Sequence, residues 1–73
     1  MDNATVVHAF KKGQDEQVQV SVGDYKNKKY VDVRVFFPNE EGTFFPTKKG
    51  LTLVVDLLPE LVKGIQAAEK AIS

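Results

Sequence analysis

Two runs of alternating valines constrain this 73-residue chain more than any other feature. Valine occupies every second position of residues 17–22, and residues 29–37 repeat the pattern. Because the side chains of a strand point alternately to its two faces, each run predicts a strand with one apolar face. Between the runs, Asn27 can adopt the positive φ that a tight reversal needs, so we expect a hairpin. Its two valine faces then form one apolar surface.

Two further strands are expected after this hairpin. The segment PNEEG is a turn by composition, and residues 43–47 are interpreted as a short third strand. Pro46 favours an edge position for that strand, because proline cannot donate a ladder hydrogen bond. The segment KKG is interpreted as another turn and residues 51–55 as the fourth strand. The sequence therefore predicts a four-stranded antiparallel meander over residues 17–55.

The apolar spacing changes after the predicted sheet. Aliphatic residues recur at steps of three and four up to Ile72, which is the stripe of an amphipathic helix. Asp56 is the expected N-cap, and Pro59 falls in the first turn, where its missing N–H costs no intrahelical bond. We expect a helix over residues 56–72 that packs on the valine face of the sheet. The predicted fold class is α+β, in the order β-β-β-β-α.

Glycine in the middle of the predicted helix costs about 1 kcal/mol relative to alanine. Close approach of a neighbouring helix would account for Gly64, and a tolerated surface glycine is the alternative. Chains this short often gain stability by oligomerising, so we interpret one side of the helix as a homodimer contact. The residues assigned to this contact are Leu57, Gly64, Ala67 and Ala71.

Residues 1–16 carry the weakest pattern in the chain. Val6, His8 and Phe10 alternate, so the segment is interpreted either as an extended arm or as an extra strand, with its first residues disordered. We therefore divide the chain into an N-terminal arm, residues 1–16, and a domain, residues 17–73.

Composition argues against most kinds of chemistry. Ten Lys and Arg residues balance ten Asp and Glu residues, so bulk charge does not predict a polyanionic ligand. The chain has no cysteine and a single histidine, its carboxylates lack metal-ligand spacing, and neither a nucleophilic triad nor a Walker motif is present. We expect no catalytic residue, no metal and no cofactor. No apolar run is long enough to cross a bilayer, which predicts an intracellular protein without a membrane partner.

The sheet face opposite the valines is the candidate functional surface. It collects rings and cations from the segment DYKNKKYVDVRVFF, although ordinary solvated charge is the alternative explanation for the cations. Rings stack on bases at about 1–3 kcal/mol each, while Lys and Arg follow phosphates, as in sequence-tolerant single-strand binders. A dimer interface that buries the rings is the competing interpretation. Asp32 and Arg34, on one face of one strand, are expected to form a structural ion pair.

Between Val20 and Leu53 the segments DYKNK, VDVR, FF, EG, a proline, KKG and LTL follow one another in a fixed order. This order resembles, without a gap, the DNA-binding domain of the positive cofactor 4 family of transcriptional coactivators. The resemblance implies a curved four-stranded sheet and a helix, paired into a homodimer that binds single-stranded DNA or melted duplex with little sequence preference. The lack of a long serine-rich extension favours the compact bacterial or phage type.

Carried over by position, the resemblance implies base-stacking rings and cations that contact phosphate. Gly23, Phe37 and Lys48 depart from the family pattern, which has arginine, tryptophan and arginine at these positions. Strict alternation places Phe36 on the face of Arg34, whereas the family pattern favours Phe37 for stacking, and a β-bulge near the strand end would reconcile the two. The expected nucleic-acid-binding residues are Tyr25, Lys26, Lys28, Arg34, Phe36, Phe37, Lys48 and Lys49.

The sequence thus predicts a homodimer that binds single-stranded DNA in transcription, replication or repair, with the transcription machinery as a further partner. One alternative is a protein-interaction module that docks a polymerase or regulator through its exposed rings and an edge strand. Another is a preference for RNA, because only contacts to the 2′-hydroxyl distinguish the two sugars. The expected location is the cytoplasm or nucleoid for a bacterial or phage protein and the nucleus for a eukaryotic one.

Overall fold

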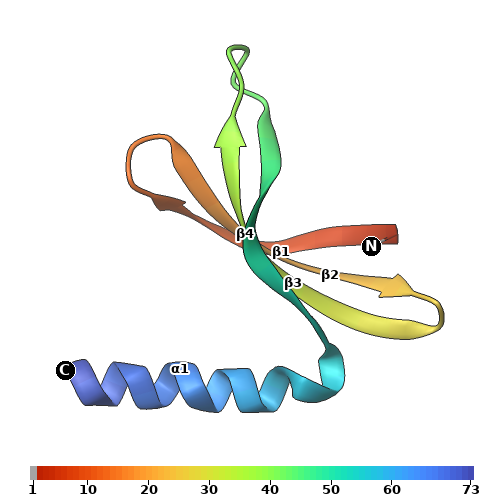
Figure 1. Cartoon of the computed structure of the whole chain (residues 1–73), viewed down its shortest axis with the longest axis vertical. Helices are drawn as coiled ribbons and strands as arrows, with labels where there is room; N and C mark the ends of the chain where they lie inside the picture. Colours follow the sequence, from red (N-terminus) through yellow and green to blue (C-terminus); the bar gives the residue numbers. More distant parts are fainter. Residues whose placement is uncertain (1) are drawn as a thin grey trace.

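The computed structural model describes residues 2–73 as one twisted antiparallel sheet followed by a helix (Figure 1). The sheet order is β1-β2-β3-β4, and each strand pairs with the next along the chain. The α+β class, the four-stranded meander and the C-terminal helix are therefore confirmed. The elements are β1 (Asp2–Lys12), β2 (Glu16–Tyr25), β3 (Lys28–Pro38), β4 (Phe44–Val54), the 3₁₀ turn η1 (Val55–Leu57) and α1 (Leu58–Ile72).

The two valine runs form the central hairpin, as predicted. β2 and β3 pair in one unbroken register, in which Val22 lies opposite Val31. Lys26 and Asn27 make the two-residue turn, with φ angles of 50° and 66°. Positive φ at both central positions is the type I′ geometry that matches the twist of the flanking strands.

The long edge strand β4 replaces the two short strands expected at residues 43–47 and 51–55. The segment KKG does not turn the chain; it lies in a bulge, and the strand continues through it. The hydroxyl group of Thr47 explains the continuity, because it donates to the carbonyl oxygen of Val35 at 2.7 Å and accepts from the Lys49 amide at 3.1 Å. These bonds take the place of ladder bonds that the bulge interrupts.

The fourth strand is β1, at the other edge of the sheet. The segment expected as an N-terminal arm therefore forms part of the sheet from Asp2 to Lys12. Its alternation is the pattern that suggested an extra strand: His8 lies opposite Val20, and Phe10 lies opposite Val18. The pairing of β1 with β2 shifts register twice, once between Asp2 and Thr5 and once between Val6 and His8.

The turn between β3 and β4 forms where its composition predicts. The side-chain oxygen of Asn39 accepts hydrogen bonds from the backbone amides of Glu41 and Thr43, both at 2.9 Å. Gly42 has a φ of 86°, a left-handed value that glycine adopts without steric cost.

The sheet has two chemically different faces. Residues opposite each other on paired strands lie on the same face, so the strand pairing assigns each side chain to one of the two. The valine face carries the side chains of His8, Phe10, Val18, Val20, Val22, Val31, Val33, Val35, Leu51 and Leu53. The polar face carries those of Gln17, Gln19, Ser21, Tyr30, Asp32, Arg34, Phe36 and Thr52.

Helix α1 does not cover the valine face of its own chain, contrary to the expected packing. None of its residues is buried, and only Leu58 and Leu61 are partly covered. After η1 the helix leaves the end of β4 and runs as a separate rod (Figure 1). Asp56 is not its N-cap either, since Leu57 takes that position without a side-chain hydrogen bond. No helix in the described part of the chain is long and apolar enough to span a membrane.

The chain leaves an unusually large surface uncovered. Its accessible area is 5831 Å², whereas a compact monomer of 8.1 kDa exposes about 4,500 Å². Its radius of gyration is 13.7 Å, against about 11 Å for a compact domain of this length. Val31, with 3% of its surface exposed, is the only buried apolar residue among residues 4–73. The valine face is therefore only partly covered, and the helix stripe is open.

Candidate nucleic-acid interface

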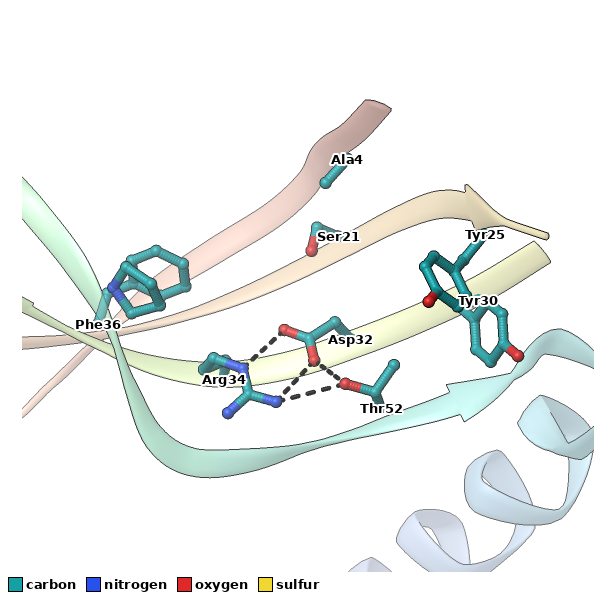
Figure 2. Close-up of a pocket in the computed structure, with 9 residues that line it drawn as sticks. Ala4, Ser21, Tyr25, Tyr30, Asp32, Arg34, Phe36 and Thr52 are labelled. Carbon is teal, nitrogen blue, oxygen red and sulfur yellow. Dashed lines mark hydrogen bonds and ion pairs between the residues drawn. The ribbon is translucent and has the colours of Figure 1, made fainter. Parts of the chain in front are cut away.

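A shallow depression on the polar face brings together residues from all four strands. Figure 2 shows Tyr25 and Tyr30 at one end and Phe36 at the other, with the side chains of Asp32 and Arg34 between them. The depression thus has rings at both ends and a polar floor, the arrangement expected from the alternation of β2 and β3.

The aromatic end is a pair of tyrosines held by their neighbours. The ring centroids of Tyr25 and Tyr30 lie 6.5 Å apart with the planes at 68°, an edge-to-face contact. The Lys26 ammonium group lies 5.2 Å from the centre of the Tyr25 ring, within cation–π range. Tyr25 still exposes 46% of its surface. Tyr30 was not among the expected binding residues, although its parity with Asp32 along β3 indicated this face.

The polar floor is built around the ion pair expected between Asp32 and Arg34, which the structure confirms. Arg34 Nε and Nη2 donate to the two carboxylate oxygens of Asp32 at 3.1 and 2.9 Å. Thr52 adds its hydroxyl group, which donates to Asp32 Oδ1 and accepts from Arg34 Nη2 at 3.3 Å. Arg34 Nη1 also donates to the carbonyl oxygen of Thr47 at 2.9 Å. One guanidinium group therefore ties β3 to β4 at two points.

This network remains ionised at neutral pH. Burial raises the pKa of the Asp32 carboxyl, but the hydrogen bonds from Arg34 and Thr52 and the charge of Arg34 outweigh it, so that its pKa lies below the ordinary 3.8. The hydrogen bond to Asp32 raises the pKa of Arg34 above its ordinary value. The pair has no net charge, and the Arg34 side chain is only 22% exposed.

The adjacent phenylalanines lie on opposite sides of β3. Phe36 lines the depression, whereas Phe37 lies opposite Phe45 and exposes 49% of its surface. A bulge does occur here, but the extra residues belong to β4, and the register of β3 with β2 is continuous up to Phe36. The geometry thus brings Phe36, rather than Phe37, onto the face of Tyr25 and Arg34, and which ring stacks on bases stays a prediction.

The expected lysines lie around the polar face in two groups. Lys28 begins β3 opposite Tyr25, next to the turn that carries Lys26. Lys48 and Lys49 lie in the bulge of β4, and both are exposed.

The structure adds Lys11 as a candidate that the sequence analysis missed. Lys11 lies opposite Gln17, which lies opposite Phe36, so these three residues form one row across the polar face. Its neighbour Lys12 instead forms an ion pair with Glu16 at 3.1 Å. In a strand over residues 2–12, Lys11 alternates with Phe10 of the valine face and so belongs to the polar face, which is the signal that could have identified it.

The residues expected at a homodimer contact are accessible in the single chain. Leu57 exposes 48% of its surface, and a methyl group on Gly64 would meet no atom within 4 Å. Ala67 and Ala71 are exposed as well. Their role in pairing stays a prediction.

The family model described as Transcriptional Coactivator p15 (PC4) matches residues 12–64, well over half of the chain. The chain belongs to the PC4 family. The resemblance noted from the sequence is thereby confirmed, and PC4 proteins are a nucleic-acid-binding family rather than an enzyme family. A search of curated proteins gives no match.

Solved PC4 structures share the fold. A PC4 homologue from Burkholderia pseudomallei is 26% identical, with a TM-score of 0.85 over 94% of this chain and 93% of that one. A second crystal form of the same homologue gives a TM-score of 0.84 at 25% identity, over 92% of this chain and 98% of that one. The bacteriophage T5 homologue of PC4, implicated in recombination-dependent DNA replication, is 23% identical, with a TM-score of 0.59 over 99% and 77% of the two chains.

Proposed function

We propose that this PC4-family chain binds single-stranded DNA with little sequence preference and works as a homodimer. The observation that carries the proposal is the polar face, where rings lie at both ends of a depression and exposed lysines lie on the adjoining turn and bulge. Phe36 and Lys28, the latter opposite Tyr25, are eight residues apart on β3, which corresponds to about 26 Å of strand. A track of this length accommodates several nucleotides.

Single strands suit this face better than duplex does. Bases in a duplex are stacked on one another, whereas unpaired bases can lie flat against exposed rings such as Tyr25 and Phe36. Stacking is sequence-tolerant because every base has a π-face. The hydrogen-bonding groups of the floor are largely used among Asp32, Arg34 and Thr52, which leaves little for reading base edges.

Five lysines supply the charge that would follow the phosphates. The ammonium groups of these residues make none of the ion pairs found in residues 2–73. Neutralising five phosphates of a single strand gives a slope of log K against log salt of about −3.5. The five are Lys11, Lys26, Lys28, Lys48 and Lys49.

A second copy of the chain is the proposed cover for the open valine face and the helix stripe. The chain exposes about 1,300 Å² more than a compact monomer of its mass, and a standard interface buries about 800 Å² per partner. Helix α1 has an apolar stripe with no buried residue in its own chain. A homodimer that pairs these surfaces would leave both polar faces free for DNA. A monomer mass by light scattering at micromolar concentration would contradict it.

The biological role belongs to the same proposal. The PC4 description names a transcriptional coactivator, and the T5 homologue is implicated in replication. We propose that the chain acts on single strands exposed inside the cell during transcription, replication or repair, with the transcription machinery as a further partner.

Fluorescence anisotropy with a labelled oligo-dT of about 20 nucleotides tests the proposal. We expect tight binding with a salt slope near −3.5 and much weaker binding to a duplex of the same length. An oligo-U of equal length measures the preference between DNA and RNA, since stacking and phosphate contacts alone do not distinguish them. Absence of oligo-dT binding at low salt would reject the proposal.

Strand addition at a sheet edge, the main alternative, has less support. The edge strand β1 shifts register twice against β2. The other edge, β4, contains Pro46 and a bulge. Irregular edges of this kind oppose pairing with another strand.

A further inference from the structure

The bulge of β4 is the most unusual backbone feature of the proposed site. Arg34 lies opposite Gly50, and Phe36 lies opposite Pro46, so that three residues of β4 face one residue of β3. Two of the three are the exposed residues Lys48 and Lys49. The bulge therefore presents a pair of adjacent cations at the edge of the sheet.

Local contacts hold the two ends of this bulge. At one end, the Thr47 hydroxyl group bonds to the carbonyl oxygen of Val35 and to the Lys49 amide, at 2.7 and 3.1 Å. At the other end, β4 approaches β3 so closely at Gly50 that a Cβ atom there would lie 2.5 Å from the carbonyl oxygen of Val33. The third contact is the hydrogen bond of 2.9 Å from Arg34 Nη1 to the carbonyl oxygen of Thr47.

Arg34 has few free hydrogen-bond donors and little uncompensated charge for binding a phosphate. Guanidinium carries five N–H donors, and four hydrogen bonds to Asp32, Thr52 and Thr47 occupy all but one of them. The carboxylate of Asp32 also neutralises its charge. Planar, bidentate pairing with a carboxylate makes arginine well suited to fixing geometry.

We infer that Arg34 is a positioning residue, which pins Thr47 and so fixes the bulge that presents Lys48 and Lys49 to nucleic acid. The inference rests on the proposed function and assigns these two lysines, rather than Arg34, to the phosphate backbone. It differs from the role that the family resemblance implies for this arginine, which is to contact phosphate or to hold the bound strand directly.

A double-mutant cycle tests the inference. Its first arm is the charge-neutral pair Asp32→Asn with Arg34→Gln, which leaves no uncompensated carboxylate to repel DNA. Its second arm is Lys48→Ala with Lys49→Ala. Oligo-dT affinity and its salt slope are measured for the wild type, both arms and the four-fold variant, with circular dichroism to confirm folding.

The two roles of Arg34 give different results in this cycle. The lysine arm should make the slope shallower by about 1.4. If Arg34 has a positioning role, the Asp32/Arg34 arm weakens oligo-dT binding when Lys48 and Lys49 are present. When both lysines are replaced by alanine, the same arm changes the affinity by less than about twofold and leaves the salt slope unchanged. An equal loss in both backgrounds, with a slope shallower by about 0.7 each time, would mean a direct phosphate contact and overturn the inference.

Thr47→Val provides a second test that removes no charge and leaves Arg34 in place. It deletes the hydroxyl bonds that hold the bulge, so we expect several-fold weaker oligo-dT binding and faster amide hydrogen exchange at Lys49. Unchanged affinity would overturn the inference. Lys63→Ala, which removes a lysine paired with Glu60 on α1, is the control and should bind as the wild type does. A wild type that does not bind oligo-dT would instead reject the proposed function.

Discussion

Phe36 and Phe37 are neighbours in β3, yet only Phe36 lines the depression that holds Tyr25, while Phe37 faces Phe45 across the ladder. The two rings therefore lie on different faces of the sheet. Phe36 lies on the polar face, where a base would stack. Phe37 points to the side of the valines, where a second copy would cover it.

Phe36→Ala should therefore weaken oligo-dT binding more than Phe37→Ala does. Loss of a stacking ring costs about 1–3 kcal/mol, which is at least about fivefold in Kd. We expect Phe37→Ala to remain within about twofold of the wild type in DNA binding and to weaken self-association instead. The measurements are anisotropy titrations above the dimerisation concentration and sedimentation equilibrium. The reverse ranking would assign stacking to Phe37.

Lys11→Ala should make the salt dependence of binding shallower, because Lys11 lies in one row with Gln17 and Phe36 on the polar face. The expected change in slope is about 0.7, the value for one phosphate contact of a single strand. Lys12→Ala is the matched control, since Lys12 pairs with Glu16 at 3.1 Å. Equal effects of the two substitutions would mean that only the overall charge matters.

Gly50→Ala should destabilise the fold by about 1–3 kcal/mol, the usual cost of overpacking. A Cβ atom at this position would lie 2.5 Å from the carbonyl oxygen of Val33 and 2.8 Å from Arg34 Cα. Both are backbone atoms, which cannot rotate away. Urea unfolding at fixed protein concentration measures the effect, and a stability equal to that of the wild type would show that β4 can move away from β3.

Gly64→Ala should act in opposite directions on the helix and on pairing. Alanine favours the helix by about 1 kcal/mol, and the added methyl group has open space around it in the single chain. In a homodimer built on the small-residue side of α1, the same methyl group separates the two helices. We expect weaker self-association by sedimentation equilibrium, with Gln66→Ala, on the opposite side of the helix, as control. Unchanged association would mean a tolerated surface glycine.

The stability difference between the wild type and Asp32→Asn should depend on pH. Because the folded-state pKa of Asp32 lies below its ordinary value of 3.8, its stabilisation is fully present above that value. It is lost as the pH falls through the lower folded-state pKa. We expect a difference of about 2 kcal/mol at pH 7 that shrinks as the pH falls below the ordinary carboxyl pKa of 3.8. A difference that stays constant over this range in urea unfolding would contradict the assignment.

The sequence was most informative where the pattern is local. The alternation of β2 and β3 predicted their pairing, the polar face and the ion pair of Asp32 with Arg34, because period-two patterning fixes which side chains share a face. The positive φ of Asn27 followed from turn chemistry in the same way.

The misassigned strands depended on long-range contacts that local patterns do not contain. Lysine, lysine and glycine in succession are typical of a turn, but here the Thr47 hydroxyl group and a close approach at Gly50 carry the strand through them. β1 has an irregular register, which weakened the alternation of residues 2–12 and hid Lys11. The packing expected for α1 was wrong because the helix buries none of its residues against the sheet of its own chain.

Val31 alone represents the buried apolar core of residues 4–73, which has a consequence for how much active protein a cell contains. With the proposed homodimer, most of the core forms only when two chains meet, so folding and assembly are one event and stability rises with concentration. Under this proposal, chains made below the dissociation constant would stay unfolded and open to proteases. The amount of folded dimer would then increase more steeply than the rate of synthesis. Gene dosage would set a threshold for the amount of folded dimer instead of changing that amount in proportion.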